Sequence, residues 1–255
     1  MVALPSVDIR RAVRMGLEED LAHGDITTTT LFPEPVPARA RIIAQQTLVV
    51  AGMAAAIQTF IAVDVSLTLT PSRRDGSHAK NGDVLLRIEG DGRSILMAER
   101  VALNFLQHLS GIATLTSRFC HAVHGYPVTI MDTRKTLPGW RALQKWAVLL
   151  GGGTNHRMSL GDGILIKDNH LALMKNKKSA ALTACRIAYA VASDDKPVIV
   201  EVETLSEVHD ALHGKADIIL LDNMTPATVK QAVKLIDRRA LVEVSGGITL
   251  KNVRA

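Results

Sequence analysis

Short β-branched segments alternate with helical segments through the second half of the chain, beginning at Pro127. This alternation is typical of parallel β-α-β units with right-handed crossovers, and it predicts either an open parallel sheet or a barrel. In both folds, ligands bind at the carboxyl ends of the strands. The expected strands are Val128–Asp132, Ile164–Lys167, Val198–Glu203, Ile218–Asp222 and Leu241–Ser245, and the expected helices are Leu137–Leu150, Ala172–Ala192, Leu205–Leu212 and Pro226–Asp237.

The first half of the chain lacks this alternation and predicts a mixed α+β domain with an antiparallel sheet. Ser6 can cap a helix that runs to Ala22, and the turn residues Gly90, Asp91 and Gly92 predict a tight hairpin. The change of pattern divides the chain into an N-terminal domain of residues 1–115 and a C-terminal domain of residues 116–255. The other expected elements are helices at residues 53–63 and 97–123 and strands at residues 38–44, 66–70, 84–89 and 94–96.

The composition limits the partners that the chain can have. The 255 residues carry a formal net charge of +5, which fits an anionic partner, but no run of Lys and Arg forms a basic tail. Only 3% of the residues are aromatic, which leaves few rings to stack on single-stranded nucleic acid. A small anionic ligand is therefore expected, and no nucleic acid.

Three features bear on where the protein acts. The apolar segment Leu48–Leu69 is interrupted by Gly52, Gln58 and Asp64, so it predicts a strand and a buried helix and no membrane partner. The N-terminus has charged residues where a signal peptide has an apolar core. The two cysteines lie far apart and form no CxxC pattern. Together these features predict a cytoplasmic protein.

Cationic side chains cluster where the first two expected strands end. Arg134 and Arg157 carry planar guanidinium groups that match a carboxylate in two hydrogen bonds, so two of them suit a dicarboxylate. For either arginine alone, a surface ion pair is the alternative. Lys135, His156 and Lys167 lie near them in the sequence and favour an anion site, although His156 alone could be a core histidine.

Acidic side chains end two neighbouring expected strands. Glu201 and Asp222 could converge on one Mg²⁺ ion, which prefers one or two carboxylates together with phosphate oxygens. Strand alternation places Glu203 on the same face as Glu201, so either glutamate could be the ligand. The alternative for Glu201 is a buried ion pair with Lys167 or Lys135.

Two glycine-rich segments have an open interpretation. Ser245, Gly246 and Gly247 follow the last expected strand and precede a helix expected near Thr249, an arrangement that can bind an anion through backbone N–H groups. The same residues could simply form a turn. The segment 151–153 (Gly-Gly-Gly) could let the backbone approach a ligand or let the chain turn toward His156. No zinc spacing, GxSxG, Walker loop or GxGxxG occurs, which disfavours a serine hydrolase and a nicotinamide dehydrogenase.

Eight motifs share one resemblance. They are EEDLAHGDITT (18–28), AERVALNFLQHLSGIAT (98–114), DTRKTLPG (132–139), GGGTNHR (151–157), IKDNH (166–170), VEVET (200–204), ILLDN (219–223) and EVSGG (243–247). In this order, over nearly the whole chain, they closely resemble the quinolinate phosphoribosyltransferase family. The combination of DTRKT with GGGxNHR and KDNH is very specific.

The resemblance implies an N-terminal α/β sandwich domain followed by an incomplete parallel α/β barrel. It implies that quinolinate and phosphoribosyl pyrophosphate (PRPP) are converted, with Mg²⁺, into nicotinate mononucleotide, pyrophosphate and CO₂ in the biosynthesis of NAD. The family continues past the position of Ala255 with a further helix, a strand and a glycine-rich phosphate loop, so the C-terminal end of the barrel is expected to be truncated.

The resemblance also implies a role for individual residues. Arg100 is expected to reach the active site of the partner subunit, so a homodimer is the smallest functional unit. Lys135, Lys167, Glu201 and Asp222 are the expected catalytic residues. The other roles are quinolinate binding by Thr133, Arg134, His156 and Arg157, binding of the ribose hydroxyls and magnesium pyrophosphate by Glu201 and Asp222, and binding of the 5′-phosphate by Ser245, Gly246 and Gly247.

Two alternatives stay open at this point. The chain could be a related pyrophosphorylase, of the type that accompanies molybdate transport, that acts on another acid. It could also be a catalytically inactive relative that only binds, because the last barrel strand is missing. Turnover of a different carboxylate would choose the first, and quinolinate binding without product would choose the second.

Overall fold

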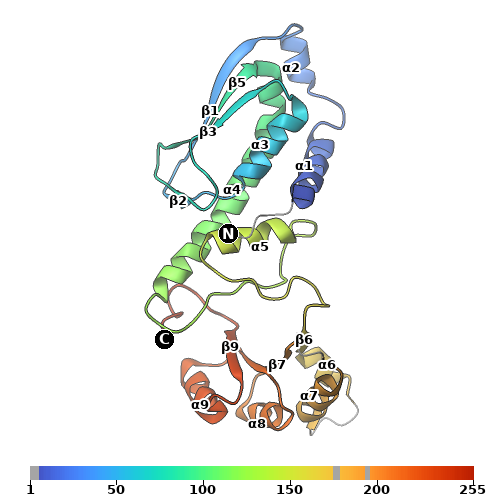
Figure 1. Cartoon of the computed structure of the whole chain (residues 1–255), viewed down its shortest axis with the longest axis vertical. Helices are drawn as coiled ribbons and strands as arrows, with labels where there is room; N and C mark the ends of the chain where they lie inside the picture. Colours follow the sequence, from blue (N-terminus) through green and yellow to red (C-terminus); the bar gives the residue numbers. More distant parts are fainter. Residues whose placement is uncertain (1–5, 175–178, 193–195) are drawn as a thin grey trace. The chain divides into compact units, whose positions relative to one another are not determined.

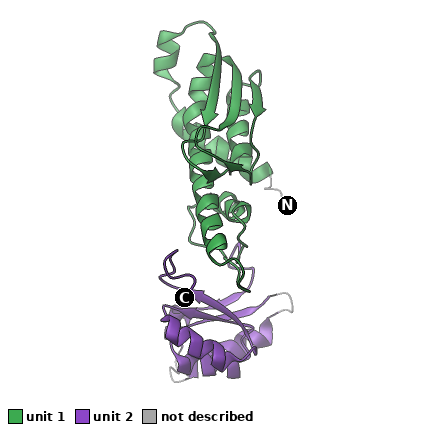
Figure 2. Ribbon diagram, turned by 90° about the vertical axis from the view of Figure 1, so that its left-hand side faces the viewer, with its two compact units in different colours: residues 1–156 green, residues 157–255 purple. Residues whose placement is uncertain are grey.

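The computed structural model describes residues 6–174, 179–192 and 196–255. The chain forms two compact units, which are residues 1–156 and residues 157–255 (Figure 2). The long helix α4 (Gly92–Ala122) runs through the predicted domain boundary at residue 115 and belongs wholly to the first unit. The boundary at residue 115 stays a prediction about the family's two domains.

The first unit contains an antiparallel sheet with the strand order β1-β5-β3, in which β5 (Val84–Asp91) is central. Leu86 and Ile88 of β5 are fully buried against Phe60 of α3 and Ala102 of α4. Helix α1 lies beside α3 and α4 in a second cluster (Figure 1). The other elements of this unit are α1 (Ser6–Asp20), α2 (Ile26–Leu31), β1 (Pro37–Ile43), β2 (Leu48–Val49), α3 (Met53–Val63), β3 (Thr68–Pro71), β4 (His78–Ala79) and α5 (Arg141–Leu150).

The predicted hairpin at Gly90–Gly92 and the expected strand at residues 94–96 are wrong, because the helix α4 begins at Gly92. Asp91 is the N-cap of this helix, and its side chain accepts a hydrogen bond from the backbone N–H of Arg93 at 3.1 Å. Ile95 and Ala98 then face the core at helical spacing. Asp91 therefore starts a helix where the local sequence indicated a two-residue turn.

The second unit contains four parallel strands in the order β6-β7-β8-β9, as the alternation predicts. Helices α6 to α9 lie on one side of these strands (Figure 1). Val200, Val202, Ile219 and Leu221 face the helices and form the core of the unit. The elements are β6 (Ile164–Ile166), α6 (Asp168–Ala172), α7 (Ala180–Val191), β7 (Val198–Val202), α8 (Leu205–His213), β8 (Ile218–Asp222), α9 (Pro226–Ile236) and β9 (Leu241–Ser245).

Three further expected elements differ from the structure. The expected strand at residues 128–132 is reduced to one parallel bridge between Met131 and Thr154. The expected helix near Thr249 is wrong, because the Asn252 side chain accepts from the Thr249 N–H and donates to the Gly247 carbonyl, closing a turn. The expected helix 172–192 is replaced by α6 and α7, and its residues 175–178 lie outside the described residues. In the part of the chain that is described, no helix is long and apolar enough to cross a membrane.

Candidate active site

The first unit carries a tight turn directly after the bridge at Met131. The hydroxyl of Thr133 accepts a hydrogen bond from the Lys135 N–H at 3.0 Å, and the Arg134 carbonyl accepts one from the Thr136 N–H at 2.9 Å. The hydroxyl of Thr136 accepts a further bond from Arg141 Nε at 3.0 Å. Thr133, predicted to bind quinolinate, therefore also shapes the turn that carries Arg134 and Lys135.

Arg134 is the predicted ligand-binding residue with the clearest unmet hydrogen-bonding capacity. Its Nε atom is buried and has no hydrogen-bond partner among the described residues. A buried donor without a partner costs roughly 1–3 kcal/mol, so native proteins rarely leave one unless a ligand or water meets it. This geometry fits a guanidinium prepared to bind an anion. Lys135, the next residue, is exposed.

A buried ion pair that the motifs did not reveal lies beneath this turn. The ammonium group of Lys145, on α5, contacts the carboxylate of Asp132, and the two side chains are only 1% and 7% exposed. Asn155 Nδ2 donates to the second oxygen of Asp132 at 2.6 Å. The one available signal was a lysine on the buried face of α5, between Leu143 and Ala147.

His156, half-buried, is held through its backbone by the same pair. Its N–H donates to Asp132 Oδ1 at 2.9 Å, and its carbonyl accepts from Lys145 Nζ at 3.0 Å. The segments that carry Arg134 and His156 are thus joined within the first unit by one hydrogen-bond network.

A second contact steadies the end of the turn. Gln144 Oε1 accepts from the Leu137 N–H at 3.1 Å, so its Nε2 is the donor toward His108 Nε2 at 2.7 Å. His108 Nε2 must then accept, which requires a neutral ring with its proton on Nδ1. Burial lowers the pKa of His108 and favours that neutral form.

Gly151 and Gly153 are explained by close packing against α4 and α5. A Cβ on Gly151 would lie 2.4 Å from the Ala113 carbonyl oxygen, and one on Gly153 would lie 2.7 Å from Val148 Cγ1. Gly152 has φ +90°, a left-handed conformation. Of the two interpretations of this segment, the structure supports the turn that brings the chain back toward His156.

In the second unit, four of the predicted residues lie on one face of the parallel sheet. Glu201 is in register with Leu220, and Asp222 with Ser245. Side chains alternate along a strand, and the neighbours Val202 and Leu221 face the helices. Glu201, Asp222 and Ser245 therefore point to the opposite face. Lys167 directly follows β6, next to Glu201. Glu201, Asp222, Ser245 and Lys167 are half-buried, which fits a polar face at the carboxyl ends of the strands.

Lys167 and Glu201 form an ion pair, which is the alternative weighed for Glu201. Lys167 Nζ lies 2.7 Å from Glu201 Oε2, and the side chains are 42% and 14% exposed. A second strand-end carboxylate, Glu203, lies one residue beyond β7 and is exposed, and its backbone N–H donates to Glu207. That one of these two glutamates holds a metal ion stays a prediction.

Asp222 is oriented by two side chains. Its Oδ1 accepts from the hydroxyl of Ser245 at 2.5 Å, and its Oδ2 accepts from Asn223 Nδ2 at 2.7 Å. Gly246 has φ +83° and lies so close to Asn223 that a Cβ would be 2.2 Å from Asn223 Oδ1. The predicted phosphate-binding residues Ser245 and Gly246 are therefore also the residues that hold the end of β8.

The residues predicted to hold Mg²⁺ are two carboxylates on one face of the sheet. Asp222 lies two residues beyond the partner of Glu201, or about 6.6 Å farther along the strand. No group of three or more His, Cys, Asp or Glu side chains that could hold a metal occurs within residues 6–174, 179–192 and 196–255. An ion that takes its other ligands from phosphate oxygens and water does not need a third protein ligand, so the pair fits Mg²⁺.

Three further predicted residues have separate surroundings. Arg157 Nη1 donates to the Gly163 carbonyl at 2.9 Å and so ties its segment to the start of β6. Arg100 is exposed on α4. Gly247 has φ +64°, and a Cβ added to it would meet no atom within 4 Å. That all the predicted residues serve a single ligand-binding site stays a prediction.

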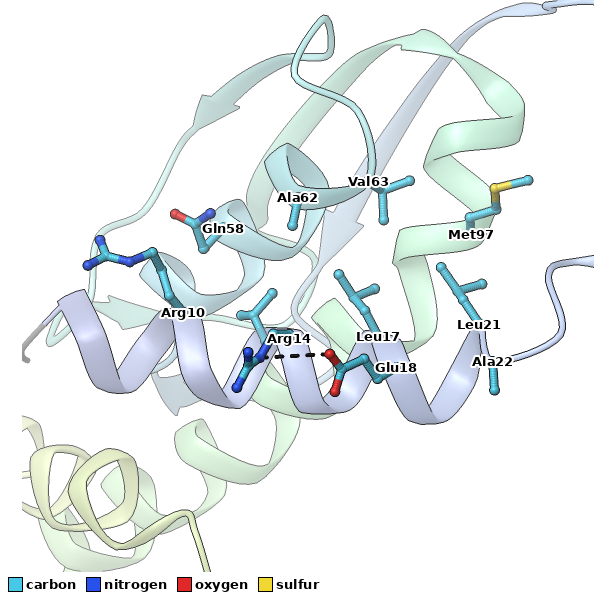
Figure 3. A pocket seen from close by; sticks show the side chains of 11 residues that line it. Arg10, Arg14, Leu17, Glu18, Leu21, Ala22, Gln58, Ala62, Val63 and Met97 are labelled. Atoms are coloured by element: carbon cyan, nitrogen blue, oxygen red, sulfur yellow. Dashed lines mark ion pairs between the residues drawn. The ribbon is translucent and has the colours of Figure 1, made fainter.

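The first unit also contains a pocket of about 760 Å³ between α1, α3 and α4 (Figure 3). Leu17, Leu21, Val63 and Met97 line it, and an ion pair between Arg14 and Glu18 lies at its edge. Its lining includes none of the predicted site residues, so its size alone does not identify it as the active site.

Comparisons with known proteins agree with the motifs. Residues 25–110 match the family model for the quinolinate phosphoribosyl transferase N-terminal domain, and residues 112–255 match the C-terminal domain. A probable nicotinate-nucleotide pyrophosphorylase [carboxylating] of Methanocaldococcus jannaschii is 40% identical over 252 residues, which are 95% of this chain and 86% of that protein. A protein of the same name from Bacillus subtilis is 38% identical over 237 residues, which are 93% of this chain and 80% of that protein.

Solved structures agree as well. A NadC deletion mutant superposes with a TM-score of 0.91 and 37% identity, covering 99% of this chain and 88% of that one. The nicotinate-nucleotide pyrophosphorylase of Francisella tularensis has a TM-score of 0.88 and 35% identity, covering 98% and 87%. The fold is thus shared over almost the whole chain.

Proposed function

The chain belongs to the quinolinate phosphoribosyltransferase family, and we propose from this membership that it transfers the phosphoribosyl group of PRPP to quinolinate with decarboxylation. The products are nicotinate mononucleotide, pyrophosphate and CO₂. The observation that carries the proposal is the match to both domain models of the family, together with 40% identity to a relative over 95% of the chain. The names of the relatives favour quinolinate over other acids as the substrate.

Quinolinate would be bound through its carboxylates by cationic side chains. The buried, unpartnered Nε of Arg134 supports this role, since a guanidinium donates two parallel hydrogen bonds to a carboxylate. Thr133, Lys135, His156 and Arg157 are the other proposed contacts. Holding one carboxylate while leaving the other free would direct which of them is lost.

The ribose would be handled by the acidic face of the second unit. As pyrophosphate leaves, C1 of the ribose gains positive charge, which the carboxylates of Glu201 and Asp222 would stabilise. The hydrogen bonds from Ser245 and Asn223 to Asp222 keep that carboxylate in one orientation before the reaction. Ser245, Gly246 and Gly247 are the proposed contacts of the 5′-phosphate.

Glu201 and Asp222 would also hold Mg²⁺, which in its bound state offsets the negative charge of the leaving pyrophosphate. Lys167, paired with Glu201 at 2.7 Å, would hold that carboxylate in place. The pyridine nitrogen of quinolinate forms the bond to C1 and becomes cationic. The cationic ring then accepts the electron pair released when the adjacent carboxylate leaves as CO₂, and a proton takes its position.

Two further parts of the proposal concern assembly and location. Arg100 is exposed on α4, which is compatible with a role in the active site of the partner in a homodimer. We propose a cytoplasmic location, which is supported by the archaeal and bacterial relatives that are named as enzymes of nucleotide metabolism.

An assay for nicotinate mononucleotide tests the proposal. The purified chain is incubated with quinolinate and PRPP, with Mg²⁺ or with EDTA, and the product is separated by chromatography. Release of labelled CO₂ from the 2-carboxyl group of quinolinate is measured in parallel. We expect both products in equal amounts, and only with Mg²⁺. Absence of both under all conditions would reject the proposed activity.

A further inference from the structure

The buried ion pair of Lys145 and Asp132 in the first unit has no direct role in the proposed transfer reaction. Lys145 and Asp132 are 1% and 7% exposed, and lysine is almost never fully buried unless it is paired. Neither side chain has the exposure that a substrate contact would need. Their partners, however, all belong to the two segments that carry proposed quinolinate contacts.

The pair determines the orientation of one residue in particular. Both backbone groups of His156 end on it, the N–H on Asp132 Oδ1 at 2.9 Å and the carbonyl on Lys145 Nζ at 3.0 Å. Apart from the bridge at Thr154, no strand ladder among the described residues supports this segment. The direction in which His156 leaves the backbone therefore depends on two charged side chains.

Asn155 closes the network. Its Nδ2 donates to Asp132 Oδ2 at 2.6 Å and to the Lys145 carbonyl at 2.8 Å, which joins α5 to both segments. Asp132 directly precedes Thr133 and Arg134, so the carboxylate that orients His156 also marks the start of the turn that carries Arg134. One network of three side chains and the backbone atoms of His156 and Lys145 thus sets the spacing of the two segments.

Stability alone is a weak reason for such a pair. Replacing a buried ion pair with apolar residues of similar volume often leaves a protein equally stable or makes it more stable, because both charges of the pair must be desolvated. The pair instead fixes the orientation of the backbone that it contacts. Charge-assisted hydrogen bonds are directional, whereas apolar contacts allow several orientations.

We propose that Lys145 and Asp132 are positioning residues of the transferase reaction, which hold His156 and the turn at Arg134 in the arrangement that binds quinolinate. The inference rests on the proposed function. It assigns neither residue a contact with substrate. Their removal should weaken quinolinate binding and leave PRPP binding nearly unchanged.

The test compares Lys145→Met, Asp132→Asn and the double variant with the unchanged chain. The control is Ser110→Ala, which removes a buried hydroxyl that bonds to Ala51 N at 3.0 Å in the core of the same unit. Steady-state kinetics give KM for each substrate, calorimetry gives the quinolinate Kd, and urea unfolding gives the stability. All kinetics are measured well below the unfolding transition of each variant.

We expect Lys145→Met to raise the quinolinate KM and Kd about tenfold, a typical result of a misplaced binding group, with the PRPP KM within about twofold. Asp132→Asn keeps the shape of the side chain and should give a smaller rise in the same direction. Ser110→Ala should lower stability without changing either KM.

The double variant separates positioning from stability. It leaves no uncompensated buried charge, so it should unfold at a higher urea concentration than Lys145→Met. Its quinolinate KM should stay high, because the His156 carbonyl still lacks its donor. Recovery of KM together with stability, or equal changes in both KM values, would overturn the inference. A chain without any transferase activity would instead reject the proposed function.

Discussion

Replacement of Gly246 by Ala should disturb the end of β8 more than any comparable change nearby. An added Cβ would lie 2.2 Å from Asn223 Oδ1 and 2.7 Å from both Asn223 Cγ and the Asn223 backbone N. Real Cβ atoms do not approach this closely, and the backbone atom cannot rotate away. The turn at Gly246 or the end of β8 must therefore shift.

The size of the effect follows from two contributions. A left-handed φ of +83° costs a residue with a Cβ about 1–2 kcal/mol. Forcing added atoms into a filled space typically costs a further 1–3 kcal/mol or so. We expect Gly246→Ala to lower the free energy of unfolding by roughly 2–5 kcal/mol. Displacement of Asn223 should also release its hydrogen bond to Asp222 and lower kcat.

Gly247→Ala is the matched control. Gly247 has φ +64°, also left-handed, but its added Cβ would meet no atom within 4 Å. This variant should lose only the conformational part, about 1–2 kcal/mol. Urea unfolding followed by circular dichroism measures both variants. Equal losses of stability in the two would show that the close approach to Asn223 has no energetic consequence and would refute the reasoning.

Three further predictions concern the first unit and the acidic face. Arg134→Ala should raise the quinolinate KM at least about tenfold, since a charge-assisted hydrogen bond contributes roughly 1.5–3 kcal/mol. Steady-state kinetics measure this, and an equal rise of the PRPP KM would count against the carboxylate-binding role. The pKa of His108 is lowered by burial, so its stabilising contribution is present above the unfolded pKa of about 6.5 and is lost as the pH falls through the folded pKa. Thermal unfolding at several pH values should show this loss in the unchanged chain and less of it in His108→Asn. Glu201→Gln should lower kcat with Mg²⁺ present and leave the quinolinate Kd unchanged, and calorimetry that finds weakened quinolinate binding would contradict the assignment of Glu201 to the sugar donor.

Much of the fold could be predicted because burial repeats with the period of each element. Helix α3 and strands β8 and β9 lie where their apolar patterns indicate, and the alternation after Pro127 correctly predicts a parallel sheet. The predictions were wrong where a residue suits two different local structures. Asp91 suits a turn and a helix N-cap equally, and only the apolar face of α4 against the core decides for the helix.

The candidate site shows the same division. The motifs alone led to the family and to the cationic and acidic residues, because residue types and their spacing carry that information. The partners of those residues were not predictable. Lys145 lies ten or more residues from each of the groups it holds, and its importance appears only when α5 is packed against α4.

For this protein, the sequence by itself determined the family, the parallel architecture of the second half and the kinds of charge that the reaction needs. These are local or periodic properties of the sequence, so they can be inferred without knowing which distant residues come into contact. Only the tertiary structure decided that Lys167 is bound to Glu201, that Ser245 and Asn223 orient Asp222, and that Lys145 and Asp132 hold the backbone of His156. Except for that between the neighbours Asp222 and Asn223, these contacts join residues far apart in the chain, and their geometry exists only after the elements have packed.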